Sequence, residues 1–87
     1  MTYVILAGIA YYASGKTGDW KRVLSDVDEQ SALRAYEKER ARGWVPDWAT
    51  EEEREAERRE YDWSALVRID SEGYEVVVHH GTYHGEL

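Results

Sequence analysis

The chain has 87 residues, and 18 acidic against 11 basic side chains give it a net charge of −7. This length allows one modest core, so we expect residues 1–87 to form a single domain and exclude a full doubly wound nucleotide-binding sheet. The negative charge argues against direct binding to nucleic acid or to an anionic membrane, because both attract cations. Without cysteine, the chain offers no disulfide, thiolate nucleophile or sulfur-based zinc site.

The apolar residues indicate an ordered, soluble protein. Four Trp and seven Tyr make up the whole aromatic set, and Phe is absent. Trp and Tyr are typical of half-buried positions and interfaces, because each combines apolar area with a polar group. The longest apolar run, residues 4–13, is interrupted by Gly8 and is too short for a membrane-spanning helix. We therefore expect a cytoplasmic location.

The first elements in chain order are two strands. Residues 2–13 are β-rich and almost continuously apolar, which is typical of a central strand covered on one face and partly on the other. Residues 14–19 have the composition of a turn, with Gly15 and Gly18. Apolar and polar residues then alternate over residues 20–27, which predicts a shorter second strand and hence a hairpin.

A helix is predicted next, over residues 29–42. Asp28 or Asp26 can cap its start, Gly43 is a natural end, and Ala32 and Tyr36 recur at helical spacing. The same spacing places Leu33 and Ala35 on the apolar face. The charged residues of the other face, Glu37, Lys38, Arg40 and Arg42, predict a solvated surface.

Residues 44–60 form an acidic insert. Pro46 makes its first part a connector, because proline disfavours a helical residue before it. Thr50 and Glu53 have the spacing of a capping box, and strong helix formers follow over residues 51–60 with almost no apolar stripe. This predicts a short, solvated helix or a mobile insert, in which pairs such as Glu55–Arg59 would contribute a few tenths of a kcal/mol.

The last third predicts a second hairpin, with strands over residues 61–70 and 74–79 and a turn at residues 70–73. The order of elements is ββα(α)ββ. We therefore predict an α+β fold: a four-stranded, mainly antiparallel sheet of two hairpins, with the first helix packed on one face and a second, short acidic helix.

Motifs of catalysis are weak or incomplete. The Gly15-Lys16-Thr17 run ends like a phosphate-binding loop, but Ala10 replaces the first glycine and a strand follows where a helix is required. His79 and His80 are neighbours on a strand and point to opposite faces, so they cannot hold one metal together. His80 and His84 with Glu86 are the remaining metal candidates, and two histidines near the end of the chain are more often surface residues.

Serine and carboxylate chemistry is no better supported. No serine lies in a nucleophile elbow, and carboxylate pairs such as Glu60 with Asp62 are expected in any acidic sequence. We expect a protein that is not an enzyme, with no catalytic residue, no metal and no cofactor.

The acidic insert is the most distinctive feature of the sequence. Residues 47–62 hold eight acids against three arginines, a local charge of −5, whereas residues 1–42 come to about +1. One interpretation is a solvated surface. The other is an acidic face that docks on a basic partner, since complementary charge accelerates association. Trp44 and Trp48 would supply hydrophobic anchors, while Trp20 and Trp63 are predicted to be in the core.

A set of short motifs is spread along the chain: Tyr3-Val-Ile-Leu-Ala-Gly8, Tyr11-Tyr12, Asp19-Trp20, the helix with Ala32 and Ala35, Asp62-Trp63 and Ile69-Asp70-Ser71-Glu72-Gly73. In these motifs the chain resembles small uncharacterised phage and bacterial ββαββ proteins. The resemblance covers about two-thirds of the chain. The sequence departs from this pattern at Ala13-Ser14, where the pattern usually has proline, and in the insert.

In size, acidity and layout the chain is also similar to phage anti-CRISPR and other anti-defence proteins, although no motif is shared. That resemblance implies a non-enzymatic inhibitor that blocks the nucleic-acid-binding surface of a host defence complex, as a nucleic-acid mimic, in the host cell cytoplasm. The residues expected to contact such a partner are Trp44, Asp47, Trp48, Glu51, Glu52, Glu53, Glu55, Glu57, Glu60 and Asp62.

A different class of function stays open beside this one. Val76, Val77 and Val78 make both faces of a predicted strand apolar. If that strand lies at a sheet edge, it could pair with a second copy, and the chain would be a structural or regulatory module that forms a homodimer.

Overall fold

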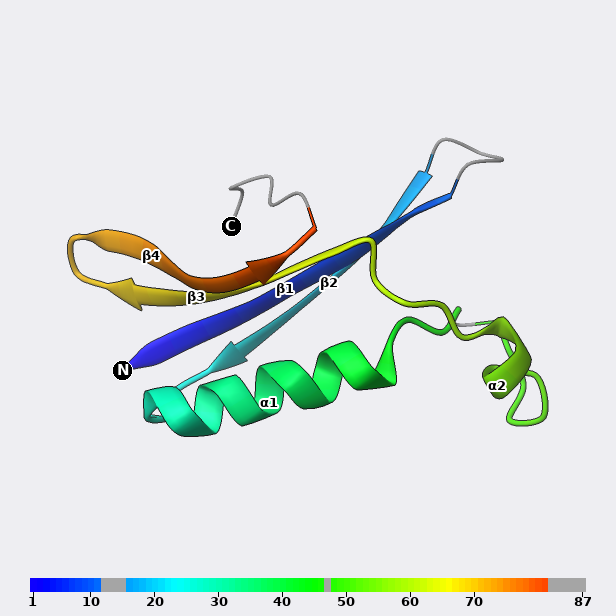
Figure 1. The fold of residues 1–87 in the computed structure, drawn as a ribbon, viewed down its shortest axis with the longest axis horizontal. Helices are drawn as coiled ribbons and strands as arrows, with labels where there is room; N and C mark the ends of the chain where they lie inside the picture. The colour runs from blue at the N-terminus through cyan, green and yellow to red at the C-terminus, as the bar shows by residue number, and fades with distance from the viewer. Residues whose placement is uncertain (12–15, 47, 82–87) are drawn as a thin grey trace.

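The sheet is built around β1 (Thr2–Tyr11), which pairs antiparallel with β2 (Lys16–Leu24) on one side and with β3 (Trp63–Asp70) on the other. Strand β4 (Gly73–His80) pairs with β3, so the strand order is β2-β1-β3-β4. In this computed structural model, residues 1–11, 16–46 and 48–81 are described. Helix α1 (Glu29–Arg42) lies along one face of the sheet, and the short helix α2 (Arg54–Glu57) lies beyond its end (Figure 1). The predicted α+β fold and its order of elements are confirmed.

Strand β1 is apolar over residues 3–9, and there both of its faces are buried. Tyr3 and Ile5 belong to the cluster that packs against α1, whereas Val4 and Leu6 belong to a second cluster with Ala65 and Val67. Alternate residues of a strand point to opposite sides, so these two clusters lie on opposite faces of the sheet. The near-continuous apolar run in the sequence follows from this position.

The first hairpin differs from the prediction at both ends of its second strand. Lys16 already pairs with Tyr11, so β2 begins four residues earlier than the predicted start at Trp20. Glycine and polar residues in this stretch favour a turn locally, but the ladder with β1 overrides that preference. Strand β2 ends at Leu24 rather than at residue 27, because Asp26 has φ 55°, a left-handed conformation that a strand cannot continue through.

Helix α1 has the predicted bounds. The Asp28 carboxylate accepts a hydrogen bond from Ser31 N at 2.8 Å, and hydrogen bonding from Ser31 lowers the pKa of Asp28. Gly43 closes the helix, with its N–H donating to Glu39 O at 3.0 Å. Ala32 and Tyr36 are both fully buried against the sheet. No helix of the described residues is long and apolar enough to cross a membrane.

The second hairpin has the predicted turn at residues 70–73, and it ends in the edge strand β4. Its register shifts between Leu66 and Val67: Leu66 pairs with Val78, and Val67 pairs with Val76. Val77 is therefore an extra residue in a bulge, and both Val77 and Val78 pack toward α1 while Val76 packs on the other face. The three valines that make this strand apolar on both faces are therefore partly buried within the chain, on opposite faces of the sheet.

Candidate functional site

Most of the predicted partner-binding residues lie on a loop that leaves the sheet-and-helix body after α1 and returns before β3 (Figure 1). We call residues 44–60 the acidic loop. Its neck is closed by two backbone hydrogen bonds, from Trp44 N to Arg59 O at 2.8 Å and from Arg59 N to Trp44 O at 2.9 Å. Arg58 Nη1 also donates to Ala41 O in the last turn of α1, at 3.3 Å. The acidic loop is thus fastened to the body at its base.

Gly43 permits the close approach at this neck. Its φ is +72°, and a Cβ atom there would lie 2.6 Å from the carbonyl oxygen of Arg59. Only glycine combines this left-handed conformation with such a close backbone contact at low cost. The residue that ends α1 therefore also forms one side of the neck.

Within the acidic loop, the predicted capping-box pair Thr50 and Glu53 is in contact, but it encloses a turn ahead of α2, whose N-cap is Glu53 and has no side-chain cap hydrogen bond. Thr50 Oγ1 donates to Glu53 Oε1 at 2.7 Å, and Glu53 N donates to Thr50 Oγ1 at 3.3 Å. The helix that follows, α2, covers only four residues of the predicted range 51–60. It has no buried residue, and a helix this short gains little from propensity alone.

The acids of the loop are mostly exposed. Glu57 is half-buried, and the exposed ones are Glu51, Glu52, Glu53, Glu55 and Glu60. Asp62 is exposed as well but lies after the loop, at the entry to β3, where its N–H donates to Gly8 O at 2.9 Å. Asp47 lies outside the described residues.

The two tryptophans predicted as anchors occupy different positions. Trp48 is 66 % exposed and lies four residues after Trp44, within the acidic loop. Trp44 is half-buried in the neck itself. Trp20 and Trp63, predicted to be in the core, are partly buried against the two core clusters.

Among the described residues of the acidic loop, five carboxylates have no ion-pair partner. Across residues 48–60, none of Glu51, Glu52, Glu55, Glu57 and Glu60 forms an ion pair with a described residue. The predicted pair between Glu55 and Arg59 is therefore wrong. Helix α2 ends before Arg59, so the four-residue helical spacing that would bring the two side chains together is lost.

Under α1, by contrast, polar side chains are paired. The Tyr36 hydroxyl, in a fully buried residue, lies 2.8 Å from Ser64 Oγ and 2.8 Å from His80 Nδ1. These three residues come from α1, β3 and β4. Burial raises the pKa of Tyr36, because the phenolate would be poorly solvated there.

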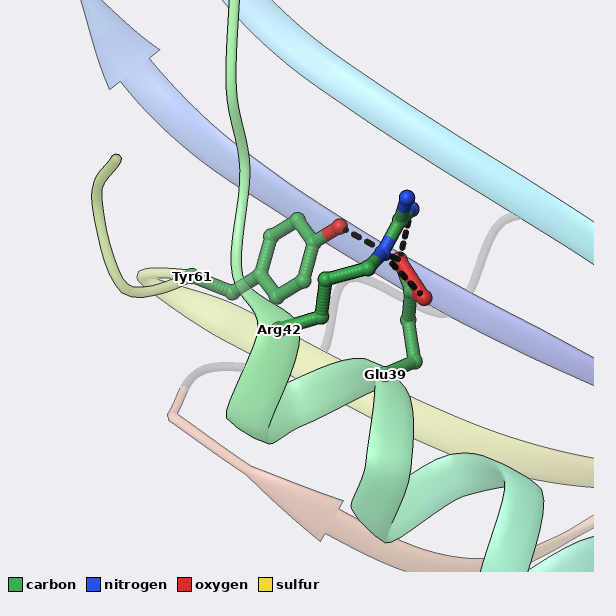
Figure 2. Close-up of polar contacts among 3 residues, drawn as sticks. All are labelled: Glu39, Arg42 and Tyr61. Carbon is green, nitrogen blue, oxygen red and sulfur yellow. Dashed lines mark hydrogen bonds and ion pairs between the residues drawn. The ribbon is translucent and has the colours of Figure 1, made fainter. Parts of the chain in front are cut away.

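A second polar cluster lies in the last turns of α1. Arg42 donates to the Glu39 carboxylate from Nε at 3.0 Å and from Nη2 at 2.5 Å, and the Tyr61 hydroxyl donates to Glu39 Oε1 at 3.0 Å (Figure 2). Glu39 is only 7 % exposed. A carboxylate can be buried at low cost only when it is paired, and Arg42 and Tyr61 provide the pairing. The hydrogen bond to Glu39 raises the pKa of Arg42, and burial together with Glu39 raises that of Tyr61. The Arg42 guanidinium also lies 5.9 Å from the centre of the Trp20 ring.

Between these two clusters, a pocket of about 290 Å³ opens at the end of α1, beside the foot of the acidic loop. Most of its wall is polar or charged. The lining residues are Glu37, Arg40, Ala41, Glu60, Tyr61, Asp62, Ser64, His80 and Gly81. Glu60 and Asp62, which look unremarkable in an acidic sequence, are thus both lining residues of one pocket.

Sequence reasoning missed both polar clusters and the pocket. The spacing of Ala32, Tyr36 and Glu39 places all three on one face of a helix, so Glu39 could have been assigned to the buried side. Ser64 and His80 carry no such local signal. Within the described part of the chain, which excludes His84 and Glu86, no three His, Asp or Glu side chains are placed to hold a metal ion.

Comparison of the chain with models of known protein families, with curated proteins and with solved structures finds no match.

Proposed function

We propose that this chain is a non-enzymatic inhibitor that docks its acidic loop on a basic, nucleic-acid-binding surface of another protein, such as a host defence complex, and blocks nucleic acid from that surface. The observation that carries the proposal is a set of exposed, unpaired carboxylates on one fastened loop. Elsewhere in the described chain, acidic side chains such as Glu37, Glu39 and Glu75 are paired with arginines.

The charge of the loop supports docking on cations. Unpaired carboxylates leave a negative field that steers a basic surface toward the loop, and this field is screened by salt because the groups are exposed. Exposed charge alone gives fast association and selectivity more than affinity. A partner with a row of lysines and arginines, as in a nucleic-acid channel, matches this field.

Trp48 supplies an apolar contact at the same place. A tryptophan that is 66 % exposed retains most of its apolar area for burial against a partner. Aromatic side chains of this kind contribute a large share of the binding energy in protein interfaces. The exposed carboxylates and Trp48 therefore lie on the same acidic loop, and the neck of the loop attaches it to the body.

The test compares charge reversal inside and outside the loop. The loop variant is Glu51→Lys with Glu52→Lys, and the matched control is Glu29→Lys with Glu72→Lys, which changes the net charge equally at exposed positions. The wild type and both variants are used to capture proteins from a host lysate, and the association rate of a captured protein is then measured at several salt concentrations.

We expect the wild type and the control to capture a nucleic-acid-binding protein, to associate with it at a rate that falls with salt, and to displace its nucleic acid. The loop variant should associate at least about tenfold more slowly at low salt. Equal association rates for the loop variant and the control would contradict the proposal. Sedimentation of the free protein tests the rival function, since a tight homodimer without any foreign partner would favour edge-strand pairing.

A further inference from the structure

Three polar side chains from three different elements meet under α1. Ser64 of β3 and His80 of β4 pair directly across the sheet, on the face that α1 covers. Tyr36 reaches both from α1, because its hydroxyl lies 2.8 Å from Ser64 Oγ and 2.8 Å from His80 Nδ1. The rings of Tyr36 and His80 are stacked, with their centroids 6.0 Å apart. We call these three residues the relay.

The protons of the relay allow two arrangements. The Tyr36 hydroxyl has one proton, so it donates to one neighbour and accepts a hydrogen bond from the other. In the first arrangement, Ser64 donates to Tyr36 and Tyr36 donates to His80 Nδ1. In the second, His80 Nδ1–H donates to Tyr36 and Tyr36 donates to Ser64. Both hydrogen bonds of the relay are made in either arrangement.

Burial selects the first arrangement when His80 is neutral. Ser64 is 2 % exposed and Tyr36 is fully buried, so a hydroxyl proton without an acceptor would be costly at either residue. The first arrangement gives both hydroxyl protons an acceptor, whereas the second leaves the Ser64 proton without one inside the relay. His80, which is exposed, then carries its ring proton on Nε2.

A positive charge on His80 imposes the second arrangement. Protonated histidine carries a hydrogen on both ring nitrogens, so Nδ1 can no longer accept a hydrogen bond. The Tyr36 phenol keeps its proton over the pH range in which histidines titrate, because burial raises the pKa of Tyr36 above the ordinary value of about 10. The Tyr36 O–H bond must therefore turn from His80 to Ser64.

We propose that the relay reverses its direction when His80 takes up a proton, and that the Ser64 hydroxyl then turns its own proton toward the neighbouring pocket. One proton from solvent binds His80 Nδ1, while Tyr36 and Ser64 keep their protons and rotate their O–H bonds. Water in the pocket of about 290 Å³ can accept the hydrogen bond from Ser64, because Ser64 is one of the lining residues. The inference goes beyond the proposed function and does not depend on it.

The titratable groups around His80 leave it free to take up this charge. Those that line the pocket with it are Glu37 and Arg40 of α1, and Glu60, Tyr61 and Asp62 of the segment before β3. Arg40 is the one basic side chain among these lining residues, and it is paired with Glu37 at 3.0 Å. On β4 itself, His79 points to the opposite face of the sheet. None of these groups therefore places an unpaired positive charge beside His80.

The direct test follows the ring nitrogens of the two neighbouring histidines by NMR, at about pH 8 and at about pH 5. His79 is the internal control, because it is exposed and its side chain makes no hydrogen bond with a described residue. We expect His80 Nδ1 to carry no hydrogen at about pH 8 and to carry one at about pH 5. That Nδ1–H should exchange with solvent at least about tenfold more slowly than the Nδ1–H of His79, because Tyr36 accepts its hydrogen bond.

Two results of this measurement would overturn the proposal. A hydrogen on His80 Nδ1 at both pH values would mean that the relay has one fixed direction. Equally fast exchange of the two Nδ1–H groups at about pH 5 would mean that the hydrogen bond to Tyr36 breaks when His80 is charged.

Ser64→Ala tests the far end of the relay. In this variant the Tyr36 proton has no acceptor when His80 is charged, but it still has one when His80 is neutral. The titration midpoint of His80 should therefore fall by about one pH unit, about a tenfold loss of proton affinity, while that of His79 stays the same. Ser71→Ala is the matched control at an exposed serine of the turn between β3 and β4, and it should move neither midpoint.

An unchanged His80 midpoint in folded Ser64→Ala would overturn the proposal, since Tyr36 would then donate to Ser64 in both charge states or in neither. The wild-type measurement requires no substitution, so it decides the question even if Ser64→Ala fails to fold.

Discussion

The polar cluster in the last turns of α1 and the acidic loop are both rich in ionisable groups. The carboxylate of the cluster is buried and paired, whereas most carboxylates of the loop are exposed. Glu39 is buried, and its carboxylate accepts hydrogen bonds from Arg42 and Tyr61. In the acidic loop, Glu52 and Glu55 are exposed and have no cationic partner among the described residues.

The difference separates groups that hold the fold together from groups that are available to a partner. A buried carboxylate must be paired, since leaving it alone would cost several kcal/mol. An exposed carboxylate costs almost nothing to leave alone, and it contributes almost nothing to stability. Substitutions in the two regions should therefore have very different effects on unfolding.

The largest effect is expected at Tyr36. Tyr36→Ala should lower the free energy of unfolding by about 3–5 kcal/mol, because a fully buried aromatic ring is removed from the core. Tyr36→Phe should lower it by about 1–3 kcal/mol, because it leaves the buried Ser64 hydroxyl without its partner. Urea unfolding measures both. A Phe variant as stable as the wild type would show that the hydrogen bonds of this cluster contribute nothing.

The next effect is expected at the neck. Gly43→Ala places a Cβ atom 2.6 Å from Arg59 O and forces alanine into a left-handed conformation, so it should cost about 1–3 kcal/mol. The bridge between Trp44 and Arg59 should open as well, which faster amide exchange at both residues would report. Unchanged exchange at these amides would mean that the neck does not depend on the glycine.

A pH dependence at alkaline pH is expected from the two polar clusters beside α1. Burial raises the pKa of Tyr36, and burial and Glu39 raise that of Tyr61. The unfolded chain therefore loses these protons first, and the free energy of unfolding should fall as pH rises above about 10, by at most about 1.4 kcal/mol per pH unit for each tyrosine. Tyr61→Phe should remove its share of this slope in unfolding curves measured between about pH 9 and about pH 11. An identical slope in that variant would contradict the assignment.

The smallest effect is expected in the acidic loop. Glu51→Gln, Glu52→Gln and Glu55→Gln should each change the free energy of unfolding by less than about 0.5 kcal/mol, because the carboxylates are exposed and unpaired. Glu53→Gln belongs with them as an internal check, since glutamine preserves the hydrogen bond to Thr50. A loss of more than about 1 kcal/mol at Glu52 would mean that the loop acids stabilise the fold.

The elements that the sequence predicts best are those whose signals are local. Helix α1 has its capping residue Asp28, its terminal Gly43 and its apolar spacing within the segment itself, so its bounds are correct. The turn at residues 70–73 is likewise encoded by its own residues. Strand β2 is different, because Lys16 and Gly18 become strand only through pairing with β1, and no local pattern reports that pairing.

In the candidate site, too, only the features with local signals could be predicted from the sequence. The acids of the loop and the capping box are visible in the sequence, because each depends on neighbours along the chain. The contacts of Tyr36 with Ser64 and His80 join residues 28 and 44 positions apart, and the pocket lies where these distant segments meet. Such sites arise from the topology of the sheet, and composition cannot reveal them.

The backbone bridge between Trp44 and Arg59 closes the acidic loop at its base, so the loop is an insertion that can vary separately from the sheet and helix. The chain that enters the loop and the chain that leaves it are joined by backbone hydrogen bonds, which do not depend on the side chains at residues 48–57. Doubling the length of a flexible loop costs only about 0.6 kcal/mol. Segments of different length and charge should therefore be tolerated at this position of the chain while the sheet and helix stay the same.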